Sequence, residues 1–305
     1  MTWELTGVPY TSMKEPGGIA DAIAALRECG LAELLRSLGV KDAGDLRLEE
    51  PSGERGPSGV LNEPALMRLV QATHGRVVDA HRAGRRPLLV GGDCPVLLGA
   101  VAAVRQVCSA PGLLMLDGHE DAWPPALSPT GEGSDSEVAI ALGRVADLPR
   151  PVSRLLPLLE SSAIAFLGPR DREELATAGL ESLRDQVAFY ADDIETSAAL
   201  RAGSDPSEAA LEAMAADSFW LHIDLDALRT EALGAVDYRQ PGGLAWDELD
   251  RLAATAVNAP GCRGASVAIY NPDLDPNRVD ARKIVAFLSR LMAASAEANH
   301  GGSGR

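Results

Sequence analysis

The sequence predicts an α/β protein with a three-layer α/β/α architecture, in which helices cover both faces of a mainly parallel central sheet. Short apolar runs alternate along the chain with longer Ala- and Leu-rich stretches. Alternating strands and helices are typical of a parallel sheet, whose strands are buried on both faces and therefore read as continuous apolar runs. The 305 residues, 46% of them hydrophobic, are sufficient for a large core.

Each element is predicted from its own run of residues. The apolar runs predict strands over Trp3–Val8, Pro87–Val90, Gly112–Leu116, Ala163–Leu167, Val187–Tyr190, Phe219–Ile223 and Ala265–Tyr270. The stretches between them predict helices over Gly18–Cys29, Glu63–Ala83, Pro95–Val107, Glu137–Val145, Arg172–Ala178, Pro206–Ala216, Trp246–Val257 and Asp280–Glu297. No internal repeat or compositional break divides the chain, so we predict one domain over residues 1–298 and a flexible tail over 299–305.

Composition narrows the classes of function. The net charge of −16 disfavours nucleic acid as a partner and fits an enzyme with a small-molecule substrate, although the charge is equally explained by solubility. The sequence contains no run of 18 apolar residues, which a membrane-spanning helix would need. The first residues lack a signal-peptide pattern, so we expect a cytoplasmic protein. The four cysteines have no paired spacing and are expected to be free thiols.

Two acidic clusters follow apolar runs, at positions where parallel sheets bind ligands. Asp117, His119 and Asp121 are spaced by two residues and point to one side while the chain stays extended; Asp224 and Asp226 repeat this spacing. Buried carboxylates repel each other unless a cation or a proton neutralises them. Oxygen-rich sites with one imidazole favour Mn²⁺ or Mg²⁺ over Fe²⁺, Co²⁺ or Zn²⁺. The alternative is that both clusters are solvated loops.

With these clusters the sequence resembles the ureohydrolase family of arginases, agmatinases and formiminoglutamases. The family's GGDHS, DAHxD and SxDxDxxDP blocks correspond here to Gly91–Pro95, Asp117–Asp121 and His222–Arg229. Further similar segments are Gly168-Pro169-Arg170-Asp171, Pro241-Gly242-Gly243-Leu244 and Tyr270-Asn271-Pro272. The resemblance extends from about Gly7 to the last predicted helix, and is more specific for the fold and metal centre than for the substrate.

The resemblance implies a centre of two Mn²⁺ ions and, as in many family members, a homo-oligomer. One ion would be bound by Cys94, Asp117, Asp121 and Asp224. The other would be bound by His119, Asp117, Asp224 and Asp226, so that Asp117 and Asp224 bridge the two. In such a centre a hydroxide between the metals attacks the carbon of a guanidino or similar group.

Cys94 departs from the family pattern, because a metal-binding histidine usually stands there. A thiolate is a softer and negatively charged ligand, which gives the centre five negative ligand charges instead of four. Cys94 is therefore either a ligand of an altered first metal or a small buried residue beside a missing one. A family member that hydrolyses hydroxyarginine also carries cysteine here, which makes the substitution compatible with catalysis.

Ile269 stands where the family has a guanidinium-binding glutamate. Isoleucine cannot pair with a cation, so a neutral or N-hydroxylated group is easier to accept than arginine in the usual pose. Trp123 is a second candidate for the wall of the substrate pocket, with plain packing as the alternative. Arg229-Thr230 replaces the usual Asp-Pro, a change next to the ligands rather than in them.

The loop over residues 130–137 lacks the histidine with which arginases shuttle protons. Glu132 and Asp135 are candidate acid/base residues if burial raises their pKa values. For Asp135 we favour a different role, the N-cap of the helix predicted from Glu137.

His222 alternates with Asp224 along its strand. It either orients a ligand or, as we favour, is a core histidine with satisfied hydrogen bonds.

Two functions follow from these observations. The first is a metal-dependent hydrolase of a linear C–N bond in a guanidino, N-hydroxyguanidino or formimino compound. The second is an arginase-fold protein with weak or no hydrolase activity that binds a metal or a partner; Cys94, Ile269 and the missing loop histidine keep this alternative open.

Overall fold

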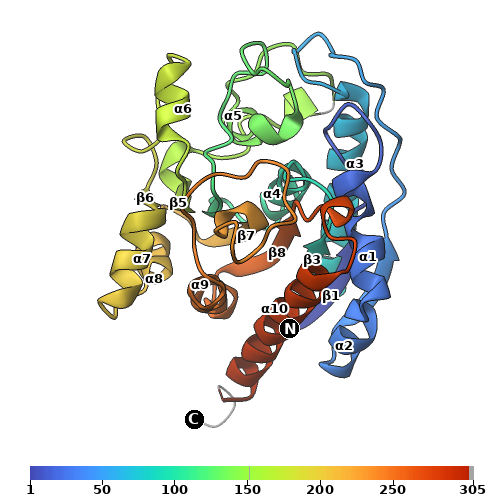
Figure 1. Cartoon of the computed structure of the whole chain (residues 1–305), viewed down its shortest axis with the longest axis vertical. Helices are drawn as coiled ribbons and strands as arrows, with labels where there is room; N and C mark the ends of the chain where they lie inside the picture. The colour runs from blue at the N-terminus through green and yellow to red at the C-terminus, as the bar shows by residue number, and fades with distance from the viewer. Residues whose placement is uncertain (151, 302–305) are drawn as a thin grey trace.

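The protein is built on a parallel eight-stranded sheet. The computed structural model, drawn in Figure 1, describes residues 1–150 and 152–301. Within them the strands are ordered β2-β1-β3-β8-β7-β4-β5-β6. The strands are β1 (Thr2–Gly7), β2 (Lys41–Asp45), β3 (Arg85–Val90), β4 (Pro111–Leu116), β5 (Ile164–Gly168), β6 (Phe189–Asp192), β7 (Ser218–Asp224) and β8 (Cys262–Ala268). The predicted fold class is confirmed, and the described sheet is parallel throughout.

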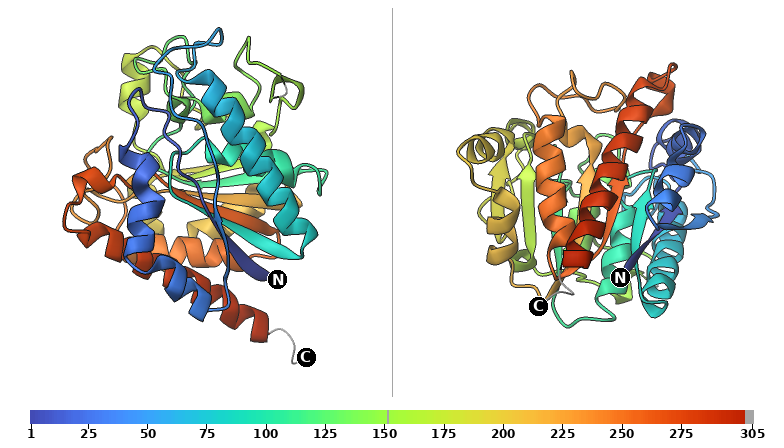
Figure 2. Two further views of the ribbon diagram at one scale, coloured as in Figure 1. Left: turned by 90° about the vertical axis from the view of Figure 1, so that its right-hand side faces the viewer. Right: turned by 90° about the horizontal axis from the view of Figure 1, so that it is seen from below.

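Helices form a layer on each face of the sheet, as the two views of Figure 2 show. Their bounds are α1 (Ala22–Glu28), α2 (Leu31–Ser37), α3 (Glu63–Arg82), α4 (Val96–Val104), α5 (Glu137–Ala141), α6 (Arg172–Thr177), α7 (Asp193–Arg201), α8 (Pro206–Ala213), α9 (Trp246–Asn258) and α10 (Val279–Gly301). The core on one face includes α3, α4 and α5, and the core on the other includes α1, α2, α9 and α10.

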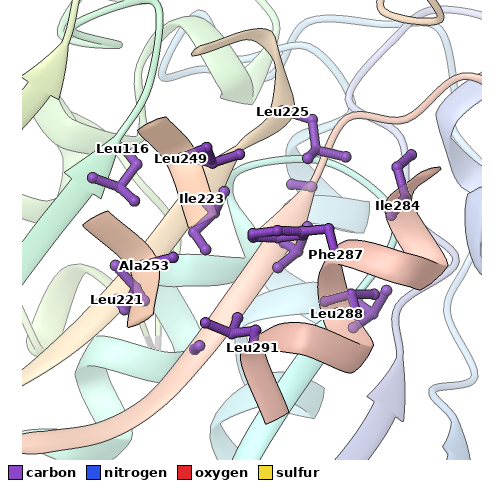
Figure 3. Close-up of a cluster of buried hydrophobic side chains, with 14 of the residues drawn as sticks. Leu116, Leu221, Ile223, Leu225, Leu249, Ala253, Ile284, Phe287, Leu288 and Leu291 are labelled. Atoms are coloured by element: carbon purple, nitrogen blue, oxygen red, sulfur yellow. The ribbon is translucent and has the colours of Figure 1, made fainter. Parts of the chain in front are cut away.

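Alternation along the strands divides the apolar side chains between these two cores. In β4, Leu113 and Met115 pack on the side of α3 and α4, whereas Leu114 and Leu116 pack on the side of α9 and α10. Successive residues of a strand point to opposite faces, so a continuous apolar run supplies both layers at once. Figure 3 shows the second core, where α9 and α10 cover Leu221 and Ile223 of β7.

All seven predicted strands are present with boundaries shifted by a few residues, but three other elements were missed. The edge strand β2 reads Lys-Asp-Ala-Gly-Asp and carries no apolar signal; it forms by pairing with β1. Helix α2 follows α1 after only two residues, and α7 begins within a capping box at Asp192 rather than at an apolar run.

Of the predicted tail over 299–305, residues 299–301 are the end of α10, and residues 302–305 lie outside the described part.

The strand order places the loops of four strands together. β3 and β4 follow each other along the chain but are separated in the sheet by β8 and β7. Ligands in parallel sheets bind at the carboxyl ends of strands near such a change of direction.

None of the described helices has the length and apolar character needed to cross a bilayer.

We expect Phe287→Ala to destabilise the protein by about 3 to 5 kcal/mol, because it removes a fully buried ring from α10. That ring packs 5.7 Å, centroid to centroid, from the ring of Trp246 on α9. Urea unfolding followed by circular dichroism measures the loss. The matched control is Leu127→Ala, which truncates a side chain that is 62% exposed and should change the stability by less than about 0.5 kcal/mol. Equal effects of the two changes would contradict this assignment of the core.

Candidate metal centre

Loops at the carboxyl ends of β3, β8, β7 and β4 form the candidate site, and these four strands are neighbours in the sheet. The loop after β3 turns sharply at Gly92, where φ is 70° and an added Cβ would lie 2.3 Å from the carbonyl oxygen of Val8. Only glycine fits this close approach of two backbones. The turn places Cys94 directly before α4, where its side chain is buried.

Backbone amides hold one oxygen of each central aspartate and leave the other oxygen for the interior of the site. Asp117 Oδ1 accepts from the amide of His119 at 2.8 Å, and Asp224 Oδ1 accepts from the amide of Asp226 at 2.7 Å. Asp226 Oδ1 accepts from the amide of Gly118 at 3.0 Å. Gly118 allows this contact, because an added Cβ would lie 2.7 Å from that same oxygen. Such fixed carboxylates are typical of ligand sets in metal sites.

Asp117, His119 and Asp226 form a first group, which we call the Asp117 cluster. One potential ligand atom from each lies within 4.8 Å of the other two. His119 Nδ1 donates to Asp226 Oδ2 at 2.8 Å. Asp117 Oδ2 is buried and has no hydrogen-bond partner among the described residues. A fully buried carboxylate oxygen without a partner costs free energy that a bound cation would recover.

Cys94, Glu137 and His222 form a second group, the Cys94 cluster, with ligand atoms that also lie within 4.8 Å of one another. The Cys94 thiol donates to Asp224 Oδ2 at 2.8 Å. The Glu137 carboxyl group lies against that of Asp121. Asp224 and Asp121 therefore adjoin the Cys94 cluster, and the two clusters together contain or contact all six of the predicted ligands.

Burial dominates the protonation of the metal-free site. It raises the pKa of Asp117 to about 8, and the Asp226 carboxylate acts in the same direction. Burial alone would lower the pKa of His119, but the Asp226 carboxylate reverses this and the pKa rises to about 10. Burial raises the pKa of the Cys94 thiol well above its usual value, with a further contribution from Asp224. Burial also raises the pKa values of Asp121 and Glu137 well above the usual range. Without a cation this site keeps protons at neutral pH.

A pocket of about 340 Å³ opens onto the Asp117 cluster, through His119 and Asp226. Eight of the ten residues predicted for the site line it: His119, Asp121, Trp123, Glu132, Asp135, Asp224, Asp226 and Ile269. The other two, Cys94 and Asp117, are buried behind these walls. The pocket is strongly acidic, because nine lining residues are carboxylates: Asp93, Asp121, Glu132, Asp135, Asp171, Glu174, Asp224, Asp226 and Asp237. Arg239 is the only Lys or Arg among the residues that line it.

Asp135 does not cap the following helix, contrary to the interpretation we favoured. Its Oδ2 accepts hydrogen bonds from Thr130 Oγ1 at 2.6 Å and from Ser128 Oγ, so it holds its own loop together. Ser136 is the N-cap of α5 and makes no side-chain capping bond. Local hydrogen bonding within a loop competed with capping here, as is common for Asp.

Glu132 has the properties of an acid/base residue. It is 7% exposed, lines the pocket and accepts from Tyr238 Oη at 2.8 Å. Burial raises its pKa to about 7, with smaller contributions from neighbouring carboxylates such as Asp93.

Ile269 lines the pocket with φ at 65°, a conformation that costs a β-branched residue free energy and is found mainly at functional sites.

Sequence reasoning missed Glu137 and misjudged His222. Glu137 had been interpreted only as the start of a helix, and its one signal was a carboxylate at the head of an otherwise apolar run. His222 is a core histidine with one satisfied nitrogen: Nδ1 is 2.7 Å from Ser266 Oγ, whereas Nε2 is buried and has no partner among the described residues. Its alternation with Asp224 along β7 did indicate that it would point toward the site.

The donor atoms fit divalent cations. Asp117 Oδ2, both Glu137 oxygens and His222 Nε2 are buried without hydrogen-bond partners in the described part of the chain. Carboxylate oxygens with one imidazole, as in the Asp117 cluster, suit Mn²⁺. The individual ligand assignments remain predictions.

Comparison with known proteins relates the whole chain to one family. The sequence model described as "Arginase family" matches residues 3–294. An arginase of Brevibacillus brevis is 25% identical over 292 residues, which cover 94% of this chain and 96% of that protein.

Solved structures share the fold at lower sequence identity. The arginase of Bacillus caldovelox superposes with a TM-score of 0.81 at 22% identity, covering 95% of this chain and 98% of that one. The formimidoylglutamase of Bacillus subtilis superposes with a TM-score of 0.71 at 18% identity, covering 97% and 88%. One fold thus occurs in proteins named for different substrates, so the fold by itself leaves the substrate open.

The metal-free protein should lose stability as the pH rises from 6.5 to 8. Asp117 and His119 have folded pKa values of about 8 and about 10, against ordinary values of 3.8 and 6.5. In this window the folded chain keeps protons that the unfolded chain has released, which lowers stability by about 1.4 kcal/mol per pH unit for each proton. Thermal unfolding in the presence of a chelator measures this slope.

Saturating Mn²⁺ should raise the melting temperature more at pH 8 than at pH 6.5, because protons and metal compete for the same carboxylates. The same titration with Mg²⁺ shows whether any divalent cation suffices. A melting temperature of the chelated protein that stays level or rises with pH would contradict the picture of trapped protons.

Proposed function

Because the chain belongs to the arginase family, we propose that it is a metal-dependent hydrolase of a linear C–N bond in a guanidino, N-hydroxyguanidino or formimino compound. The observation that carries this proposal is the set of aspartates at the carboxyl ends of β4 and β7, each with one oxygen fixed by a backbone amide. Aspartates held in this way are prepared to bind cations without reorganising.

Two divalent cations are the cofactor we propose, one of them Mn²⁺ with Asp117, His119, Asp224 and Asp226 as its ligands. Bound divalent cations supply Lewis acidity and lower the pKa of water so that it can act as a nucleophile near neutral pH. The protein supplies the orientation of the ligands and, through the deep position of Asp117, a site with restricted access to solvent.

The pocket supports a substrate with cationic or strongly polar character. Carboxylates dominate its walls, and they would attract such a molecule and disfavour an anionic one. Ile269 places an apolar surface at the position of the family's guanidinium-binding glutamate, which supports a neutral or N-hydroxylated reacting group over a charged guanidinium. Trp123 contributes a second apolar wall.

Glu132 is the residue we propose for the transfer of a proton to the departing amine. A general acid works best when its pKa lies near the working pH, and burial brings Glu132 to about 7. The hydrogen bond from Tyr238 fixes its carboxyl group at the pocket wall. It would thereby replace the histidine that is missing from this loop.

The proposal is tested by loading chelator-treated protein with Mn²⁺ and supplying arginine, N-hydroxyarginine, agmatine and formiminoglutamate in parallel. With Mn²⁺ in excess as the only metal supplied, we expect up to two Mn²⁺ per chain and release of urea, hydroxyurea or formamide from at least one compound. Asp226→Asn should abolish turnover, because it removes a ligand that also positions His119. No release from the whole panel at full metal occupancy would favour the alternative of a metal-binding protein without hydrolase activity.

Glu132→Gln should lower kcat by about 10²- to 10⁴-fold on the substrate that the panel identifies. In the unchanged protein we expect kcat/KM to fall as the pH rises through about 7, because the protonated form of Glu132 is required. This limb should be absent from the variant. Glu174→Gln is the matched control, since Glu174 lines the same pocket and its Oε2 accepts only a long bond of 3.4 Å from Gln240. An unchanged pH profile in Glu132→Gln would assign the proton transfer to another group.

A further inference from the structure

The Cys94 cluster brings together three kinds of ligand from three parts of the fold. Cys94 follows β3, His222 lies on β7, and Glu137 begins α5. Their ligand atoms lie within 4.8 Å of one another, and the three side chains are between 0% and 1% exposed. Two of these residues, Glu137 and His222, are outside the ligand set that the family resemblance implies.

Glu137 and His222 direct unsatisfied polar atoms at this cluster. The Glu137 oxygens have no hydrogen-bond partner of ordinary geometry among the described residues. The Asp121 carboxyl lies against that of Glu137 and can pair with it only through a shared proton, which a bound cation would replace. His222 Nε2 is likewise buried without a partner in the described part of the chain. Buried polar atoms are almost always paired in native proteins, so these three unpaired atoms in one cluster indicate a missing positive group.

His222 is oriented as metal-binding histidines are. Its Nδ1 lies 2.7 Å from Ser266 Oγ, which also accepts from Trp220 Nε1 at 2.9 Å. A histidine that ligates through Nε2 usually gives its Nδ1 proton to a fixed acceptor, and Ser266 is such an acceptor. In the tautomer that carries its proton on Nδ1, the lone pair of Nε2 is free for a cation.

The charge of the cluster matches a single divalent cation. A thiolate and a carboxylate carry one negative charge each, and the imidazole is neutral, so a dipositive ion makes the group neutral. By contrast, the two-metal centre implied by the resemblance would place five negative ligand charges, the Cys94 thiolate among them, around the four positive charges of two divalent ions. In a buried site the neutral arrangement costs less free energy.

The donor types favour Zn²⁺ over Mn²⁺. Sulfur and imidazole are soft or borderline ligands that suit Zn²⁺, whereas Mn²⁺ prefers oxygen. Tetrahedral Zn²⁺ sites place neighbouring ligand atoms about 3.4 to 3.6 Å apart, which small side-chain rotations can reach from the separations seen here.

A role for Cys94 as a nucleophile is less compatible with its position. Its side chain is 1% exposed and does not line the substrate pocket, whereas Asp121 and Asp224 do. A substrate would have to displace those residues to reach the sulfur. Burial of this kind is typical of a structural or metal-binding cysteine.

We propose that Cys94, Glu137 and His222 form a thiolate–carboxylate–imidazole site for one Zn²⁺ ion, next to the oxygen-rich Asp117 cluster that takes the Mn²⁺. The centre then holds two different metals instead of two manganese ions. This inference rests on the metal chemistry of the proposed function but not on hydrolysis, and it is tested by readouts of the metal itself.

The test starts from full-length protein freed of metal by a chelator and titrated with CoCl₂. Co²⁺ substitutes for Zn²⁺, and a thiolate ligand gives it a charge-transfer band in the near ultraviolet. We expect this band at the first equivalent, displaced by ZnCl₂ but not by MnCl₂. Cys94→Ser should abolish it, and Glu137→Gln and His222→Gln should each weaken Co²⁺ binding by more than about 100-fold, the upper limit for residues outside the ligand set.

Matched variants separate this site from its surroundings. Cys262→Ser removes another buried cysteine, on β8, and should leave the band unchanged. His119→Asn alters the Asp117 cluster; it should abolish hydrolysis and keep the band. Circular dichroism and thermal unfolding verify that each variant is folded, and zinc X-ray absorption of the unchanged protein reports the ligands without any substitution, with one sulfur and one imidazole expected.

Several outcomes would overturn the proposal. The absence of the charge-transfer band, or a zinc environment of oxygen and sulfur without imidazole, would exclude the site. A band that Glu137→Gln and His222→Gln leave at full strength would show that Cys94 shares a metal with the aspartates instead. If the band behaves as expected while no guanidino or formimino compound is hydrolysed, the proposed function fails and the Zn²⁺ site stands.

Discussion

The mutual repulsion of buried carboxyl groups is the constraint on which this site depends. Five of them meet at the carboxyl ends of β4 and β7 and at the start of α5, each less than 9% exposed: Asp117, Asp121, Glu137, Asp224 and Asp226. A protein can hold such a group only with protons or with cations, since the charged forms are not otherwise stable away from water. The raised pKa values of Asp117 and Glu137 show that protons neutralise carboxyl groups of the metal-free site. Protons alone leave several buried oxygens without a hydrogen-bond partner in the described part of the chain.

The sheet provides the rigidity that keeps these charges together. Parallel strands packed on both faces end at one edge, and backbone amides of the following loops bind one oxygen of each central aspartate. Two nearby residues, Asp121 and Ile269, have φ values of 46° and 65°, which are unfavourable for residues other than glycine. Such backbone strain persists only where the surrounding packing enforces it, and two of the five non-glycine residues with positive φ in the described part of the chain line the pocket.

The departures from the family pattern make more sense together than separately. Cys94 would be a poor ligand for manganese, but it lies beside a histidine, His222, and a glutamate, Glu137. These three residues supply the ligands of a different metal rather than damage an existing site. In the same acidic pocket, Ile269 supplies an apolar wall and Glu132 the acid we propose, a combination that supports a reacting group other than a free guanidinium.

The sequence by itself determined the fold class, seven strands and the two acidic motifs, because apolar runs and residues spaced by two are local signals. It missed β2, which has no apolar residue pattern and forms only by pairing with β1. Only the tertiary structure decided that Glu137 and His222 meet Cys94, since residues 43 to 128 positions apart along the chain are joined by packing. Likewise, Asp135 bonds within its own loop rather than capping α5, a choice between two similar hydrogen bonds that depends on the fold around it.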